Sequence, residues 1–243
     1  MHMRNKKWAK PELNACDFYT DTPQTLIGKW HEQFADPSAP LFMELGCGKG
    51  VSTAKMVSAN PSVNYVVIDI APNVLGDTRR NIVKAYEDQP VKNVIIAKTN
   101  IEYIHECFSA KDRIKRIYIN FCNPWTKRGK HEKRRLTHPR QLFQYRSFMD
   151  DDAEIWFKTD DDLLFEDSLV YFEKCGFAVQ YISRDLHADG FEPNYESEHE
   201  KKFSDEGVPI KFVIVRKMPG DWEFDATRWR RDLPQTKSEE HES

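Results

Sequence analysis

The sequence predicts an α/β fold built around one largely parallel sheet. Short apolar runs alternate along the chain with segments of helical periodicity, which is the pattern of strands joined by helical crossovers. The first clear run leads into a glycine-rich turn, and polar side chains follow several of the later runs. Because the carboxyl ends of parallel strands meet at one edge of a sheet, we expect a ligand site there.

The segment 41–50 organises this fold. Its apolar part, 41–45, is too short for a helix and predicts a strand. Three glycines follow at alternate positions, Gly46, Gly48 and Gly50, before a segment that can wind as a helix. Glycines allow positive φ angles and let a ligand approach the backbone closely. The sequence therefore predicts a strand, a ligand-binding turn and a helix start.

The residues at this turn disfavour a dinucleotide as its ligand. In a dinucleotide fingerprint the third glycine follows the second by three residues, and here it follows by two. Glu44 would also repel a pyrophosphate but suits a cation, and S-adenosylmethionine carries an ammonium and a sulfonium. Asp69 ends the next strand, 65–69, about twenty residues after Gly48, where a carboxylate accepts ribose hydroxyls. The alternative is a phosphate-binding or purely structural turn.

The remaining elements follow in order. A helix is expected at 73–88, with Asn73 as its cap, and two further helices are expected at 141–149 and from 161 to 175. Shorter helices are expected at 25–34 and 101–108. The other strands are expected at 94–97, 114–121, 154–160, 177–182 and 210–216. The long polar connection 183–209 is either a functional loop or a solvated helix.

Composition limits the classes of protein. At 243 residues, with no internal repeat or second core, the chain suits one α/β domain. Its 40% hydrophobic residues exclude wholesale disorder. The five cysteines form no Cys-x-x-Cys pair and no zinc spacing with histidine, so we expect reduced thiols and no metal site. No apolar run is long enough to span a membrane and no secretion signal is visible, so the cytoplasm is the default location.

A cationic segment follows the strand 114–121. Residues 126–140 include seven lysines or arginines and one glutamate, although the whole chain has a net charge of -3. Next to a small-molecule site, such a run favours nucleic-acid phosphates as partner. Trp125 is available to stack on a base or to pack under the loop. The alternative is a solvated basic loop without a partner.

The chain resembles the bacterial tRNA (guanine-N7)-methyltransferase family. The motifs that carry the resemblance span most of the chain in the family's order. They are residues 44–50 (ELGCGKG), 123–127 (NPWTK) with 131–136 (HEKRRL), 158–160 (KTD), and 197–200 (SEHE) with Phe203 and Gly207. The basic Pro-Trp loop is the specific one, because many methyltransferases share the glycine turn.

The resemblance implies a fold, a cofactor and a substrate. It implies a Rossmann-like methyltransferase fold with a seven-stranded, mostly parallel sheet and an antiparallel last strand. It also implies S-adenosylmethionine as cofactor and a guanine of the tRNA variable loop as substrate, with a monomer or homodimer as the working unit. Residues 1–39 would be an extension on or near the substrate side, 40–217 the methyltransferase domain, and 218–243 a C-terminal segment with a polar tail.

The family's site residues carry over position by position. The cofactor positions are Glu44, Gly46, Gly48, Asp69, Asn100 and Asn123. The substrate positions are Lys127, Asp160, Ser197, Glu198, His199 and Glu200. The catalytic position is Asn123, where the family usually has Asp. It also usually has Asp at Asn100, Pro at Thr126 and Thr at Ser197, and the basic loop here is one residue longer around Gly129.

Three alternative functions are weighed against the same residues. A methyltransferase acting on another RNA, a protein or a small metabolite would keep the cofactor site but need no cationic loop. An RNA-binding module without catalysis would not need Glu44 and Asp69 beside an intact glycine turn. A nicotinamide dehydrogenase is disfavoured by the glycine spacing.

Overall fold

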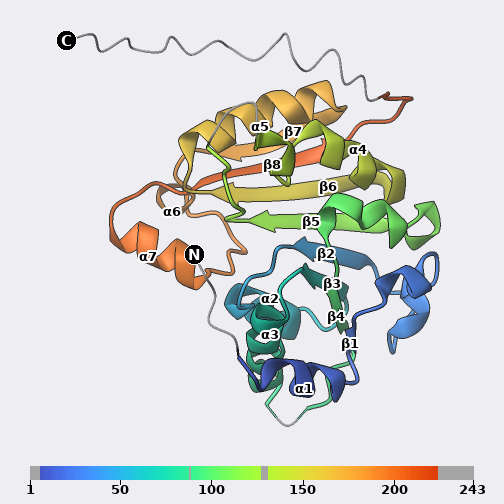
Figure 1. The fold of residues 1–243 in the computed structure, drawn as a ribbon. Coiled ribbons are helices and arrows are strands. Elements are labelled where there is room, and N and C mark those ends of the chain that lie inside the picture. Colours follow the sequence, from blue (N-terminus) through green and yellow to red (C-terminus); the bar gives the residue numbers. More distant parts are fainter. Residues whose placement is uncertain (1–5, 88, 127–130, 224–243) are drawn as a thin grey trace.

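The structure is a computed structural model that describes residues 6–87, 89–126 and 131–223. Within these residues eight strands form one sheet, in the order β1-β4-β3-β2-β5-β6-β8-β7 (Figure 1). The strands are β1 (Tyr19–Thr20), β2 (Leu41–Leu45), β3 (Asn64–Asp69), β4 (Val94–Lys98), β5 (Ile114–Asn120), β6 (Met149–Thr159), β7 (Phe177–Ser183) and β8 (Lys211–Lys217). The α/β class and the largely parallel sheet are therefore confirmed.

The strand count corrects the expectation of seven. The extra strand, β1, lies at the edge of the sheet and pairs in parallel with β4, where the Ile96 N–H donates to the Phe18 carbonyl at 2.8 Å. Two residues are too few to show an alternating pattern, so the sequence gives no signal for β1. The antiparallel last strand is confirmed, because β8 runs antiparallel to both β6 and β7.

Helices cover both faces of the sheet (Figure 1). On one face, α1 (Ala9–Asn14) and α2 (Val51–Ala59) pack against α3 (Pro72–Ala85), which lies on β3 and β4. On the other face, α4 (Pro139–Phe148) and α5 (Asp162–Lys174) pack on β6. The connection between β7 and β8 contains α6 (Leu186–Asp189) and α7 (Glu198–Asp205). Its helical alternative is thus confirmed for two short stretches.

Two expected helices are instead short 3₁₀ turns. The segment 25–34 contains η1 (Pro23–Leu26) and η2 (Trp30–Gln33), and the segment 101–108 contains η3 (Ile101–Glu106). A carboxylate from elsewhere in the chain explains the first difference. Asp112 accepts hydrogen bonds from the backbone N–H groups of Gly28 and Trp30, at 2.9 and 3.4 Å. These groups therefore have a tertiary partner and are not used in a continuous α-helix.

The start of α3 also differs from the expectation. Pro72 is the first helical residue, and Ala71 occupies the cap position. Asn73 is not the cap, because its Oδ1 accepts a hydrogen bond from the Lys6 N–H at 3.1 Å. Proline at the first position loses no helical hydrogen bond. The N-terminal segment is thereby tied to α3.

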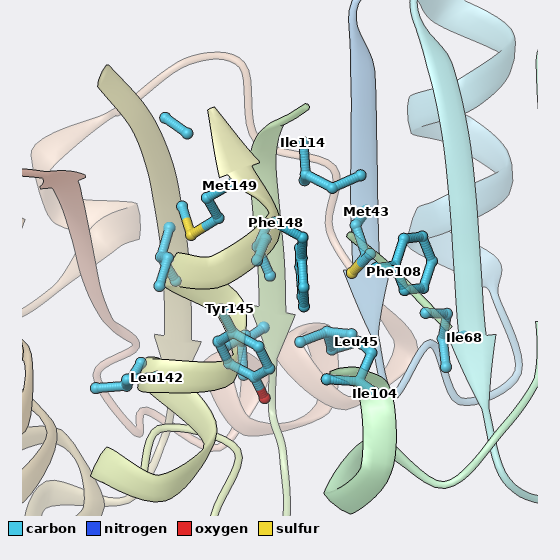
Figure 2. Close-up of a cluster of buried hydrophobic side chains, with 14 of the residues drawn as sticks. Met43, Leu45, Ile68, Ile104, Phe108, Ile114, Leu142, Tyr145, Phe148 and Met149 are labelled. Carbon is cyan, nitrogen blue, oxygen red and sulfur yellow. The ribbon is translucent and has the colours of Figure 1, made fainter. Parts of the chain in front are cut away.

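The larger core lies between the sheet and the helices α4 and α5 that cover one of its faces (Figure 2). Leu41, Met43 and Leu45 of β2 all belong to it and are fully buried. Because side chains alternate along a strand, Phe42 and Glu44 project to the opposite face. The β2 pattern thus places an ionisable group under α2, away from the larger core.

Gly50 is the last residue of the glycine turn and stands directly before α2. Its φ is +70°, and a Cβ there would lie 2.5 Å from Thr78 Cγ2 and 2.9 Å from Thr78 Cα. Contact with the backbone of α3 cannot be relieved by a rotamer change. Only glycine therefore lets α2 begin this close to α3.

We predict that Gly50→Ala lowers the free energy of unfolding by about 3 kcal/mol, through left-handed strain and overpacking. Gly48→Ala is the matched control, because Gly48 has φ +57° but open space where the Cβ would stand. It should cost only about 1 kcal/mol. Urea unfolding followed by circular dichroism measures both, and equal losses would contradict the packing argument.

Candidate cofactor and substrate cleft

Three polar side chains project from neighbouring strands on one face of the sheet. Glu44 on β2 is paired in register with Tyr118 on β5, and Asn120 on β5 is paired with Lys158 on β6. The strand order reverses between β2 and β5, since β3 and β4 lie on one side of β2 and β5 and β6 on the other. Open α/β sheets bind ligands at such a switch point, beyond the carboxyl ends of the strands.

Glu44 is a buried carboxylate at this switch point. It is 2% exposed, accepts a hydrogen bond from Thr53 Oγ1 at 2.5 Å and another from Asn120 Nδ2 at 3.3 Å. Burial raises the pKa of Glu44, although these hydrogen bonds and the charge of Lys158 act in the opposite direction. Within the described part of the chain no side chain forms an ion pair with it. A ligand cation would therefore find a desolvated negative charge.

The cavity in front of Glu44, which we call the glycine-turn cavity, lies between the glycine turn and α7. It has a volume of about 660 Å³, within the range of small-molecule sites. Its lining includes Glu44, Gly46, Gly48, Asn120, Phe121 and the α7 residues Ser197, Glu198 and His199. Open space stands over Gly48. The sequence expectation that the turn faces a ligand space is consistent with this geometry.

A second cavity begins on the other side of Gly46, and we call it the Asp69 cavity. It has a volume of about 380 Å³ and is lined by Gly46, Asp69, Ile70, Thr99, Asn100, Ile101, Glu102, Trp125, Arg134 and Leu136. Asp69 Oδ1 accepts the Ala71 N–H at 2.9 Å, and burial raises the pKa of this carboxyl. Since Gly46 lines both cavities, they adjoin at the glycine turn, and we refer to the two together as the cleft.

Asn100 lines the Asp69 cavity but also has a local task. Its Oδ1 accepts the Glu102 N–H at 3.1 Å and so caps η3. An amide side chain keeps two N–H donors in addition to this acceptor. Asn100 can therefore hold the loop and still offer donors to a ligand.

The cationic segment lies at the mouth of this cleft. Trp125 and Arg134 both line the Asp69 cavity, and the Arg134 guanidinium lies 5.1 Å from the Trp125 ring centroid. Trp125 also stacks with the His131 ring at 5.8 Å. Lys127 and the insertion around Gly129 fall outside the described residues. The basic segment thus lies beside Asp69, as the sequence predicts.

Arg135 departs from the idea of a uniformly solvated basic run. Its side chain is fully buried, donates to the Pro124 carbonyl at 2.7 Å and forms an ion pair with Asp167 at 2.6 Å. Lys133 and Arg134, by contrast, are exposed. Arg135 therefore anchors the segment on α5, whereas Lys133 and Arg134 face solvent.

Asn123 lies just before the cationic segment and is exposed. Its Oδ1 accepts the Trp125 N–H at 3.0 Å, which closes a turn in which Trp125 has a φ of +45°. This turn fixes the backbone of Trp125 at the edge of the Asp69 cavity. The catalytic and cofactor roles expected for Asn123 stay predictions.

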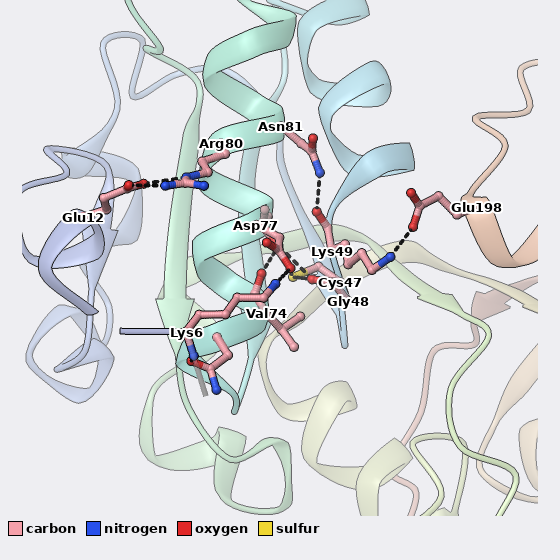
Figure 3. A network of polar contacts seen from close by, with 12 residues as sticks. Lys6, Glu12, Cys47, Gly48, Lys49, Val74, Asp77, Arg80, Asn81 and Glu198 are labelled. Carbon is pink, nitrogen blue, oxygen red and sulfur yellow. Dashed lines mark hydrogen bonds and ion pairs between the residues drawn. The ribbon is translucent and has the colours of Figure 1, made fainter. Parts of the chain in front are cut away.

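Asp160 and residues 197–200, all expected to bind substrate, come together at the amino-terminal turn of α7, which lies beyond the carboxyl ends of β2 and β5 (Figure 1). Ser197 caps α7 by accepting the Glu200 N–H at 3.0 Å. Glu198 pairs with Lys49 of the glycine turn at 2.8 Å (Figure 3). The Lys49 carbonyl in turn accepts a hydrogen bond from Asn81 of α3. Segments far apart in sequence thus enclose the glycine-turn cavity.

Asp160 and His199 meet at this turn. His199 Nε2 lies 3.1 Å from Asp160 Oδ1. The His199 ring stands between Phe121 and Phe203, with centroid distances of 4.8 and 4.4 Å. Glu200 points the other way: its side chain is fully buried and paired with Lys158. Asp160 and His199 therefore lie at the rim of the cleft, and we call them the rim residues, whereas the Glu200 carboxylate is buried.

Sequence reasoning missed four residues of this site: Thr53, Asn120, Phe121 and Lys158. Strand periodicity gives a signal for two of them, because Asn120 and Lys158 project to the same face as Glu44. Thr53 has no comparable signal, since only the packing of α2 brings its hydroxyl to Glu44. The sequence predicts Phe121 as the end of a strand, but β5 ends at Asn120 and the Phe121 φ of +50° turns that residue out of the sheet.

Two classes of feature are absent from the described residues. No helix there is long and apolar enough to cross a membrane. No group of three or more His, Cys, Asp or Glu side chains there could hold a metal ion.

The sheet order and the cleft at its switch point are those of an open, doubly wound α/β protein with a ligand site at the carboxyl edge of its strands. The chain is similar to solved methyltransferases in fold: to 16S rRNA methyltransferase KamB with a TM-score of 0.54 and 10% identity, covering 89% of this chain and 96% of that one. A structure of an antibiotic-related methyltransferase gives a TM-score of 0.52 at 16% identity, covering 74% and 88%. Residues 38–213 match the family model described as "Putative methyltransferase".

Similarity to whole proteins is more specific. The chain is 52% identical over 219 residues to the tRNA (guanine-N(7)-)-methyltransferase of Clostridium beijerinckii, covering 89% of this chain and 99% of the relative. It is 50% identical over 219 residues, with the same coverage, to the protein of that name from Clostridium botulinum. The chain belongs to the bacterial tRNA (guanine-N7)-methyltransferase family.

We predict that Glu44→Gln stabilises the cofactor-free protein at neutral pH. The same variant should bind the cofactor about 100-fold more weakly, which corresponds to a loss of about 3 kcal/mol for a broken buried charge pair. Because burial raises the pKa of Glu44, protonation contributes stability that is present at low pH and lost as the pH rises through that pKa. The advantage of the variant should therefore grow with pH.

Thermal unfolding across a pH series and calorimetric titration with S-adenosylmethionine measure the two effects. Glu198→Gln is the control, because Glu198 is exposed and paired with Lys49 at the surface. It should leave the pH dependence of stability nearly unchanged. A Glu44→Gln variant that lost stability at high pH would contradict the assignment of a strained carboxylate.

Proposed function

We propose that the protein transfers a methyl group from S-adenosylmethionine to N7 of a guanine in the variable loop of tRNA. The observation that carries this proposal is the junction of three features. A cleft between the carboxylates Glu44 and Asp69 opens beside the exposed cations of the Trp125 to Arg135 segment, and α7 closes its other end. A small neutral substrate would not need such a cationic border.

The residues of the cleft suit the proposed cofactor. Glu44 would accept the ammonium group, and the open backbone at Gly46 and Gly48 would run beneath the amino-acid part. Asp69 would accept the ribose hydroxyls, and Asn100 lies on the wall of the same cavity. When bound, S-adenosylmethionine supplies an activated methyl group on its sulfonium.

The chain's own contribution to the chemistry is positioning. Guanine N7 carries an unprotonated lone pair at neutral pH, so no residue has to act as a base. Alignment of two reactants alone can supply about 7 to 11 kcal/mol. The ring becomes cationic on methylation, and an oriented carboxylate stabilises such developing charge. Asp160 can fill this role, whereas Glu200 is already neutralised by Lys158 at 2.7 Å.

The tRNA would approach over the exposed part of the cationic segment. Lys133, Arg134 and Arg140 are exposed there and can meet phosphates. We keep Lys127 in the same role by family resemblance. The aromatic group formed by Phe121, His199 and Phe203 offers a face on which the guanine can stack.

Incubation with unmodified tRNA and methyl-labelled S-adenosylmethionine tests this function. We expect one 7-methylguanosine per tRNA, placed in the variable loop by nuclease mapping. The tRNA affinity should fall steeply as the salt concentration rises. The logarithm of the binding constant should fall against the logarithm of the salt concentration with a slope near -0.9 per phosphate contacted on duplex nucleic acid, and with a shallower slope on single strands. Label in protein, in another nucleoside or in no product would overturn the proposal.

A substitution series at Asn123 tests its role in positioning. Asn123→Asp should keep kcat within about threefold, because a carboxylate can also accept the Trp125 N–H. Asn123→Ala removes that acceptor and should lower kcat by about tenfold or more through lost orientation. Single-turnover rates at saturating tRNA measure both. Equal rates for all three proteins would remove Asn123 from the mechanism.

A further inference from the structure

Glu200 is the least accessible of the residues expected to bind substrate. Its carboxylate is fully buried and has several partners inside the protein. Lys158 Nζ donates to Oε2 at 2.7 Å, Asn194 Nδ2 donates to Oε1 at 2.7 Å, and His187 Nε2 lies 3.2 Å from Oε1. A carboxylate with this set of donors has little remaining capacity for a substrate.

Lys158 is the central donor of this group. Its side chain is 9% exposed, and Nζ also donates to Asn194 Oδ1 at 2.8 Å. Lys158 lies on β6, two residues before Asp160, whereas Glu200 is in the first turn of α7 next to His199. The ion pair therefore joins the end of β6 to the helix turn whose His199 contacts Asp160.

Lys158 also faces the cofactor side of the cleft. A small cavity behind Glu44 is lined by Glu44, Asn120, Lys158 and Asn194 among others. The positive charge of Lys158 lowers the pKa of Glu44 against the larger effect of burial. One lysine thus serves a substrate-side carboxylate by direct contact and a cofactor-side carboxylate by its charge.

We propose that Lys158 is a positioning residue that fastens the amino-terminal turn of α7 over Asp160, and that Glu200 serves tRNA binding only through this pair. The proposal rests on the proposed function for its substrate. It assigns the rim residues Asp160 and His199 to the base and assigns the buried pair to holding them in register. A buried ion pair that lost one partner would leave an uncompensated charge, and the turn would shift to hydrate it.

A double-variant cycle tests the pair. Lys158→Met alone should reduce kcat/KM for tRNA by at least tenfold, mostly through KM, and keep the dissociation constant of S-adenosylmethionine within about tenfold. Adding Glu200→Gln should restore most of the loss, because the amide still accepts from Asn194 and His187 and no charge is stranded. If Glu200 contacts the guanine directly, the double variant will be no better than Glu200→Gln alone, and the proposal fails.

Lys211 provides the matched control. It is a second buried lysine beside Asp160, donating to the Asp160 carbonyl at 3.1 Å and pairing with Asp162 at 2.7 Å. Lys211→Met combined with Glu200→Gln should show additive losses, since the two side chains share no contact. Rescue by this combination as well would show a nonspecific effect and overturn the specific pairing.

Hydrogen exchange of the α7 amides, measured without tRNA, separates this inference from the proposed function. Lys158→Met should exchange residues 198–205 at least tenfold faster than the wild type, and the double variant should return toward the wild-type rate. This readout holds even if tRNA is not the substrate. Unchanged α7 exchange in a folded Lys158→Met protein would overturn the fastening role. If that variant does not fold, α7 exchange in the double variant is compared with the wild type, and exchange that does not return toward the wild-type rate would overturn the role.

Discussion

The structure depends on one electrostatic constraint, which is the burial of the Glu44 carboxylate at the point where the strand order reverses. A desolvated charge without an ion-pair partner is unfavourable in the empty protein. Thr53 and Asn120 reduce this cost by hydrogen bonds but do not neutralise the charge. The arrangement is therefore best satisfied when a cation from outside occupies the cleft, and the proposed cofactor carries two such groups, an ammonium and a sulfonium.

The opposite wall of the cleft follows a different rule. At α7 the buried charges are matched within the chain, with Lys158 against Glu200 and supporting contacts from Asn194 and His187. This wall is held in place before any ligand arrives, while the partly exposed pair of Asp160 and His199 remains available. The Glu44 side of the cleft is neutralised only by a ligand cation, whereas the α7 side is already neutralised within the chain and supplies fixed geometry.

Much of this organisation is visible in the sequence. The strand ending at Leu45, the glycine turn and Asp69 predict the cofactor side because strand periodicity and glycine spacing are local properties. The substrate side is only partly predictable. The family resemblance selects residues 197–200 as substrate positions, but their pattern cannot tell that Glu200 points inward to Lys158. That distinction arises from tertiary packing, as do the Asp112 contacts that replace a helix by two turns.

The basic segment shows the same division within a single run of residues. Arg134 and Arg135 are neighbours of identical type, yet one lies against Trp125 at the cleft and the other is buried against Asp167. The buried Arg135 fixes the described part of the charged segment, while Lys133 and Arg134 stay exposed. As a consequence, evolution can tune the affinity for a polyanion at the outward positions, while a change at the inward arginine would be selected as a change in folding.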